Sequence, residues 1–149
     1  IKKMTDKEYY VRGCTALLDA VGRTISHISM IRKYIRKEDI PQNTIIAITT
    51  DGMENASHEY NYEQIKKMIE EKKKDGWEFL FIGANIDAAE EASRIGISRD
   101  RAANYISDSV GTGAVYNALS ESMSCMRKHG AVAKNWNENI LKDAKRRKK

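Results

Sequence analysis

The run Ile45–Thr49, which leads into Thr50-Asp51-Gly52, limits the folds open to this chain more than any other segment. An apolar β-branched run of this length is typical of a strand that is buried on both faces, as in a parallel sheet. We expect Gly52 to permit a sharp turn out of the strand, which leaves Asp51 at the strand's carboxyl end. Ligands of open α/β sheets bind in the crevice at that end. A carboxylate flanked by hydroxyl groups suits Mg²⁺, which prefers oxygen ligands.

Strands and helices alternate along the rest of the chain. Helical periodicity and capping residues predict helices over residues 16–37, 62–74 and 87–94, with Asn61 capping the second, and one last helix from 112 into the 140s. Further strands are predicted over residues 77–83 and 104–106. This order predicts an α/β, Rossmann-like fold with a mostly parallel sheet flanked by helices. Three strands are few for such a sheet, so we expect the edge at Ile45–Thr49 to be open and the sheet to be incomplete in this chain.

A second segment, Gly13-Cys14-Thr15-Ala16-Leu17, opens the first predicted helix. A hydroxyl at that place can cap backbone N–H groups or face a bound ion. Together with Asp51 and its surroundings, this segment resembles the von Willebrand factor type A domain of the bacterial intracellular type. In that family a metal-ion-dependent adhesion site includes a Thr in a Gly-x-Thr-x-Leu context and an Asp in Thr-Asp-Gly, which Thr15 and Asp51 match. Asn55 matches an Asn that often follows Thr-Asp-Gly in bacterial members, and the resemblance extends from about Tyr10 to about Met126.

The family's first motif, Asp-x-Ser-x-Ser, does not occur in these residues. Asp108-Ser109 lies too late in the chain and lacks the second serine. Because the motif precedes the Gly-x-Thr segment in the family, we expect residues 1–141 to be the C-terminal part of a longer domain of this type. The alternative is a family member that has lost the site.

The resemblance implies protein binding that depends on Mg²⁺, with Mn²⁺ or Ca²⁺ as alternative ions. Thr15 and Asp51 would be ligands, and an Asp or Glu of a protein partner would complete the coordination of the ion. The residues expected to border the site are Gly13, Cys14, Gly52, Glu54, Asn55, Asn85, Asp87 and Asp108. Two alternatives stay open: a Mg²⁺-dependent phosphoryl-transfer or hydrolytic enzyme, and a metal-free interaction scaffold. We expect no enzyme, because no paired base or nucleophile stands beside Asp51.

The net charge of +5 lies in residues 142–149, which hold six basic residues and one acidic residue, so the remainder is neutral. We expect 142–149 to be a solvated basic tail whose removal leaves thermal stability nearly unchanged. No aromatic platform or basic stripe accompanies it, so nucleic acid is not an expected partner. The two cysteines, Cys14 and Cys125, make no disulfide framework, and no apolar run reaches the ~20 residues that span a membrane. We therefore expect a cytoplasmic protein with no membrane partner, which can self-associate through the open sheet edge.

Overall fold

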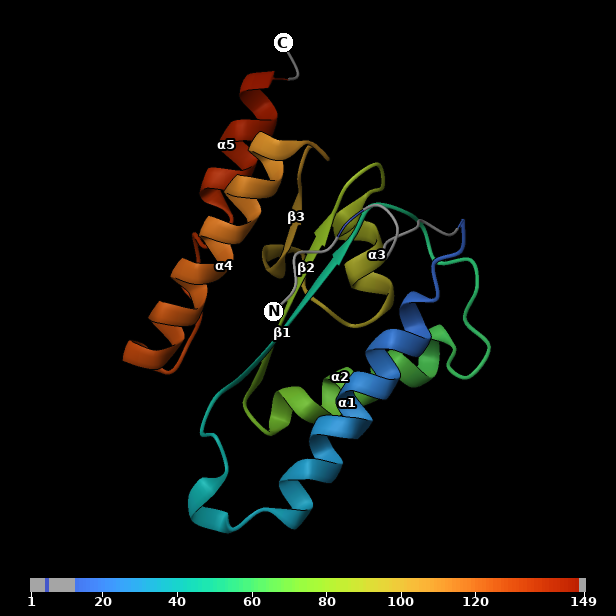
Figure 1. Cartoon of the computed structure of the whole chain (residues 1–149), viewed down its shortest axis with the longest axis vertical. Helices are drawn as coiled ribbons and strands as arrows, with labels where there is room; N and C mark the ends of the chain where they lie inside the picture. Colours follow the sequence, from blue (N-terminus) through green and yellow to red (C-terminus); the bar gives the residue numbers. More distant parts are fainter. Residues whose placement is uncertain (1–4, 6–12, 148–149) are drawn as a thin grey trace.

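Three parallel strands form the centre of the computed structural model, which describes Thr5 and residues 13–147 (Figure 1). The strands are β1 (Thr44–Thr50), β2 (Trp77–Gly83) and β3 (Ala102–Asn104), in the order β1-β2-β3. β1 and β2 pair along their full length, and the last three residues of β2 pair with β3. Because the strands are parallel, their carboxyl ends share one edge, which we call the rim. Residues 1–4, 6–12 and 148–149 lie outside the described part of the chain, and so does the start of the family resemblance at Tyr10.

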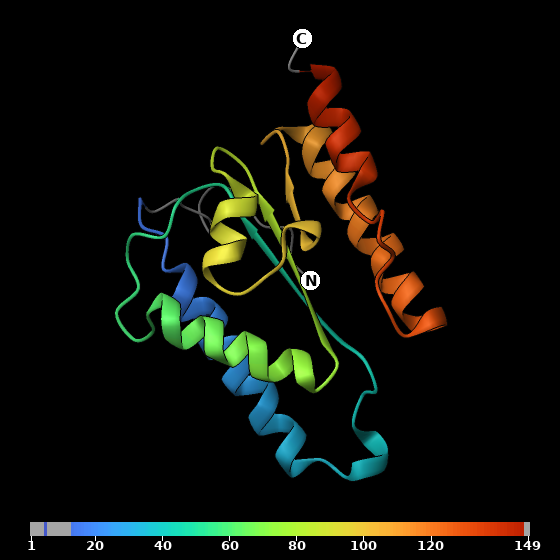
Figure 2. The ribbon, with the colours of Figure 1, turned by 180° about the vertical axis from the view of Figure 1, so that it is seen from behind.

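Helices cover both faces of this sheet (Figures 1 and 2). The first face carries α1 (Leu17–Tyr34), α2 (Tyr62–Lys74) and α3 (Ala88–Arg94). The second face carries α4 (Ser109–His129) and α5 (Glu138–Arg147), which run side by side. This arrangement confirms the predicted α/β, Rossmann-like class. None of the helices that the structure describes is long and apolar enough to cross a membrane.

The alternation of β2 side chains explains why the sheet has two cores. Phe79 and Phe81 point into the core shared with α1, α2 and α3, whereas Leu80 and Ile82 point into the core shared with α4 and α5. All four side chains are at most 2% exposed. A strand buried in this way on both faces needs an uninterrupted apolar sequence, which is what its residues provide.

Helix α2 and strand β2 have the predicted bounds because strong local signals mark their ends. The Asn61 side chain accepts a hydrogen bond from Gln64 N, and the Gln64 side chain accepts one from Asn61 N, both at 2.9 Å. This reciprocal pair is a capping box. Gly76, with φ +79°, then turns the chain from α2 into β2.

The prediction of a single last helix was wrong. Gly130 adopts a left-handed conformation, with φ +71°, and its N–H donates to Met126 O at 2.8 Å. A glycine in this conformation ends a helix. The chain turns back after it, so α5 packs antiparallel to α4. The predicted third strand was also misplaced: β3 comprises Ala102–Asn104, whose alanines carry a weak sequence signal for a strand.

Residues 142–147 of the expected tail belong to the packed helix α5. Ala144 is buried, and Arg147 pairs with Asp143 of its own helix and with Asp108 ahead of α4. Nη2 of Arg147 lies 2.7 Å from the Asp143 carboxylate and 3.1 Å from the Asp108 carboxylate. The expectation that these residues can be removed without loss of stability therefore has to be revised.

Strand β1 forms an edge of the sheet, as predicted for the described part of the chain, where it pairs with β2 alone. Ile46 and Ile48 are buried toward α1, while Ala47 and Thr49 on the other face are exposed. A hollow of about 240 Å³ lies along this edge between β1 and the first turns of α1. This edge carries no lysine or proline of the kind that protects edge strands from pairing.

Candidate functional site

The turn Thr50-Asp51-Gly52 stands at the rim and is held by the buried Thr50 side chain. Its Oγ1 donates to Gly52 O at 2.9 Å and accepts from Gly52 N at 3.3 Å. Ala84 N donates to Thr50 O at 2.9 Å, which fixes the turn to the end of β2. The Asp51 side chain is exposed and has no hydrogen bond or ion pair within the described residues. The result is a free carboxylate on a firmly held turn.

Gly52 does not serve the turn in the way expected from the sequence. The described glycines with positive φ are Gly76, Gly96 and Gly130, so Gly52 is not in the left-handed region. A Cβ built on Gly52 would instead lie 3.5 Å from Thr15 Oγ1. The missing side chain therefore keeps open the space between the turn and the Thr15 hydroxyl.

Thr15 is brought to this turn by Asn55. Thr15 N donates to Asn55 Oδ1 at 2.8 Å, and Asn55 N donates to Thr15 O at 3.1 Å. Both bonds use the Thr15 backbone, so its hydroxyl has no partner among the residues described. The structure thus holds a free hydroxyl and a free carboxylate from two distant segments on the same turn of the rim.

Glu54 faces the start of α1 rather than the open rim. Its carboxylate accepts four hydrogen bonds: from Leu18 N at 2.9 Å, Ala56 N at 2.9 Å, Ser57 N at 2.7 Å and Ser57 Oγ at 2.8 Å. Partial burial raises the pKa of Glu54, but the hydrogen bonds outweigh this effect and leave its pKa below the ordinary value of 4.5. Glu54 is therefore a charged cap for α1 and for its own loop, with both oxygens occupied.

Asp19 is a residue that supports the candidate site and that the sequence did not reveal. From the first turn of α1 its carboxylate accepts from the backbone N–H groups of His58 at 3.0 Å, Glu59 at 2.9 Å and Tyr60 at 2.9 Å. The hydrogen bond from His58 lowers the pKa of Asp19 most, against burial, which raises it. Asp19 N in turn donates to Ser57 Oγ at 3.0 Å.

These contacts join the 54–60 loop to the start of α1 from both sides. We call the five residues that make them the α1 clasp: Thr15, Asp19, Glu54, Asn55 and Ser57. An acidic residue in the first turn of a helix looks like an ordinary partner for the helix dipole. The partners of Asp19 are instead backbone N–H groups about 40 positions away in the sequence. The identity of the side chain alone does not predict such contacts.

The other acids predicted at the rim have structural partners. Asp87 caps α3 by accepting from Ala89 N and Glu90 N, both at 3.0 Å. Asp108 caps α4 by accepting from Gly111 N at 2.8 Å and is paired with Arg147. The hydrogen bond from Arg147 lowers the pKa of Asp108.

Asn85, by contrast, is exposed and adopts φ +59°, an uncommon conformation for a residue other than glycine. It borders the largest hollow at the rim, about 450 Å³ in volume, together with Asp87, Asn104 and Tyr105. Gly13 and Cys14 are exposed at the start of α1, next to Thr15 in the chain. Exposed polar residues of the rim therefore lie before α1 and after β2 as well as on the Asp51 turn.

Gly111 has a packing role at the start of α4. A Cβ on Gly111 would lie 2.0 Å from Ile106 O, so only glycine fits where α4 starts against the preceding loop. The side chain of Asp108 already occupies the helix N-terminus.

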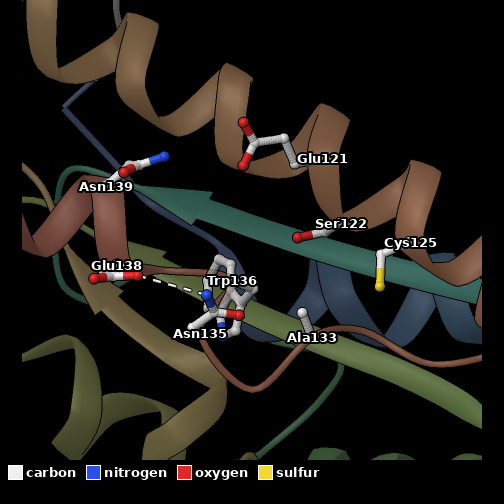
Figure 3. A pocket seen from close by; sticks show the side chains of 8 residues that line it. All are labelled: Glu121, Ser122, Cys125, Ala133, Asn135, Trp136, Glu138 and Asn139. Carbon is white, nitrogen blue, oxygen red and sulfur yellow. Dashed lines mark hydrogen bonds between the residues drawn. The ribbon is translucent and has the colours of Figure 1, made fainter.

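A further hollow, about 190 Å³ in volume, lies between α4 and α5 (Figure 3). Several of its polar side chains are paired within the fold: Ser122 Oγ donates to Ala118 O, and Trp136 Nε1 donates to Asp100 O at 2.8 Å. Glu138 pairs with Lys142 at 2.6 Å. In the part of the chain that the structure describes, no group of three or more His, Cys, Asp or Glu side chains is placed to hold a metal ion.

Comparison of the chain with family models, with curated proteins and with solved structures found no significant match. The structure itself shows an α/β, Rossmann-like fold.

Proposed function

We propose that this chain is a protein-binding module of the von Willebrand A type whose activity depends on Mg²⁺. Thr15 and Asp51 would hold the ion, and an Asp or Glu of the partner protein would complete its coordination. The observation that supports this proposal is that Asn55 holds Thr15 next to the turn that carries Asp51, and that neither the Asp51 carboxylate nor the Thr15 hydroxyl has a partner among the described residues.

The chemistry of these donors fits a hard cation. Both are oxygen ligands, and Mg²⁺ commonly binds through one or two carboxylates while keeping several waters. A site with so little protein charge leaves the ion strongly attracted to an incoming carboxylate. Mn²⁺ and Ca²⁺ accept the same kinds of ligand. With two ligands from this chain, we expect weak binding and an ion that is mostly coordinated by water.

Protein binding is better supported than hydrolysis or phosphoryl transfer. An enzyme of either kind would need a free base or nucleophile near the ion. Glu54 has both oxygens occupied by hydrogen bonds, and Asp108 is paired with Arg147. These two acids act as caps, and the exposed rim suits contact with a large partner.

Paramagnetic Mn²⁺ tests the ion site directly. In ¹H–¹⁵N spectra of the protein, we expect Mn²⁺ to broaden first the amide signals of residues 13–16 and 51–55, and Mg²⁺ to reverse the broadening. Asp51→Ala should abolish the effect. Glu71→Ala, which removes an exposed carboxylate from α2, is the matched control and should leave it unchanged. Broadening that is the same in Asp51→Ala as in the wild type would refute the site.

Addition of a blocked peptide that contains a single Asp tests the role of the partner. A peptide carboxylate that enters the coordination shell displaces water from Mn²⁺, so the effect of the protein-bound ion on water relaxation should fall. The same peptide with Asn in place of Asp is the control. An equal effect of both peptides would contradict coordination by the partner's carboxylate.

A further inference from the structure

A second polar hollow lies at the end of the sheet opposite the rim. It has a volume of about 310 Å³ and is lined by Ser29 and Arg32 of α1, Lys72 and Asp75 at the end of α2, and Trp77, the first residue of β2. We call it the basal hollow. No rim residue lines it, so it is separate from the proposed ion site.

Two buried polar atoms of residues that line the basal hollow have no hydrogen-bond partner among the described residues: Ser29 Oγ and Trp77 Nε1. Trp77 as a whole is only 4% exposed. Buried polar groups nearly always have a hydrogen-bond partner. Two unpaired polar atoms in residues that line one hollow therefore call for an explanation. The indole N–H can only donate. Whatever satisfies it must therefore present an acceptor.

The charged residues around the hollow favour a negatively charged acceptor. The Arg32 guanidinium and the Lys72 ammonium each lie 5.4 Å from the centre of the Trp77 ring. Asp75 is the single acid of the lining; it pairs with Lys72 at 3.0 Å and its side chain is 58% exposed. Two cations against one carboxylate leave a net positive charge.

Donors also remain unused in the hollow. Arg32 binds Thr44 Oγ1 and Pro41 O through its two terminal nitrogens, which leaves its Nε–H free. Two carbonyl groups in the last turn of α2, Lys72 O and Lys73 O, accept hydrogen bonds from Asp75 N and Gly76 N. The lining of the hollow therefore offers more donors than acceptors.

We propose that the basal hollow binds a phosphate group, either free or at the end of a small phosphate monoester. Ser29 Oγ and Trp77 Nε1 donate to its oxygens, while Arg32 and Lys72 balance its charge. A tetrahedral group can accept from donors on α1, α2 and β2 at once, whereas a planar carboxylate is recognised side-on by a single guanidinium. The phosphate takes the place of Asp75 on Lys72, because an exposed ion pair is weak and easily exchanged.

The two tryptophans of the chain give this proposal an internal control. Trp136 Nε1 is already bonded to Asp100 O, whereas Trp77 Nε1 is unpaired. In a titration with inorganic phosphate at constant ionic strength, we expect a saturable downfield shift of the Trp77 indole N–H signal and none of the Trp136 signal. Glycerol 3-phosphate should act like phosphate, and acetate should act only at far higher concentration.

Single substitutions test which side chains contribute to phosphate binding. Lys72→Met should weaken phosphate binding at least tenfold and Ser29→Ala several-fold, whereas Lys74→Met, which removes an exposed charge nearby, should leave it nearly unchanged. The proposal is overturned if phosphate shifts neither indole, if both shift together without saturation, or if acetate saturates at lower concentration than phosphate. Wild-type affinity in both Lys72→Met and Ser29→Ala would also overturn it.

Discussion

The replacement of Glu54 by Gln tests whether the α1 clasp holds the candidate site together. The wild-type carboxylate accepts four hydrogen bonds, three from backbone N–H groups and one from Ser57 Oγ. An amide has one acceptor oxygen. In its best orientation the Ser57 hydroxyl reverses and accepts from the new NH₂ group, but Leu18 N loses its partner.

The cost follows from the number and kind of these bonds. Hydrogen bonds to a charged group contribute about 1.5–3 kcal/mol each and neutral ones about 1 kcal/mol. One bond is lost and three become neutral. Glu54 is only partly buried, so solvent reduces the summed energy of the one lost and three weakened hydrogen bonds. We expect a loss of about 3 kcal/mol in the free energy of unfolding. For a domain of this size that loss lowers the melting temperature by roughly 6–12 °C.

Thermal unfolding followed by circular dichroism measures this loss, with Glu71→Gln as the matched control. Glu71 is exposed on α2, so its replacement should change the melting temperature little. The folded state lowers the pKa of Glu54, so its stabilisation is complete above the unfolded value of about 4.5 and is lost as the pH falls through the folded pKa. The gap between the wild type and Glu54→Gln should therefore be full at pH 7 and should close at acid pH. Equal melting temperatures for Glu54→Gln and Glu71→Gln at pH 7 would refute the clasp.

Four other changes have expected outcomes. Asn55→Ala removes the acceptor for Thr15 N and should cost about 1 kcal/mol; the Mn²⁺ broadening of the Thr15 amide should weaken, and unchanged broadening would show that Asn55 does not position it. Deletion of residues 142–149 removes packed turns of α5 and should lower the calorimetric melting temperature by several degrees, whereas an unchanged value would show that these residues do not stabilise the fold. Gly111→Ala forces a methyl group onto a carbonyl oxygen and should destabilise by about 1–3 kcal/mol or more. Gly113 lies in the same helix, and a Cβ there has no neighbouring atom within 4 Å, so Gly113→Ala should stabilise by about 0.4–1 kcal/mol in denaturant titrations. A Gly111→Ala variant more stable than Gly113→Ala would contradict this packing.

The sequence predicted the elements whose ends carry strong local signals. Helix α2 and strand β2 were located to the residue because Asn61 and Gln64 form a capping box and Gly76 turns the chain between them. The prediction of a single last helix missed the break at Gly130. A glycine after a basic last turn is a stop signal, and it would have located the end of the helix.

The arrangement of the candidate site was predicted only in part. The strand–turn pattern led to Asp51 and the family resemblance led to Thr15, and the structure brings the two segments together. The capping role of Glu54 and the three backbone contacts of Asp19 could not be predicted, because they depend on how the 54–60 loop folds against α1. The basal hollow could not be predicted from the sequence either, because its lining comes from three elements.

Calorimetric titration of the protein with Mg²⁺, compared between the wild type and Asp51→Ala, tests the proposed function most directly. Asp51 is exposed and fills no core space, so the variant should fold like the wild type. We predict weak, saturable Mg²⁺ binding to the wild type and none to Asp51→Ala, with Thr15→Ala retaining part of the affinity. Equal Mg²⁺ affinity of the wild type and Asp51→Ala would contradict the metal-dependent site and would favour a metal-free interaction scaffold.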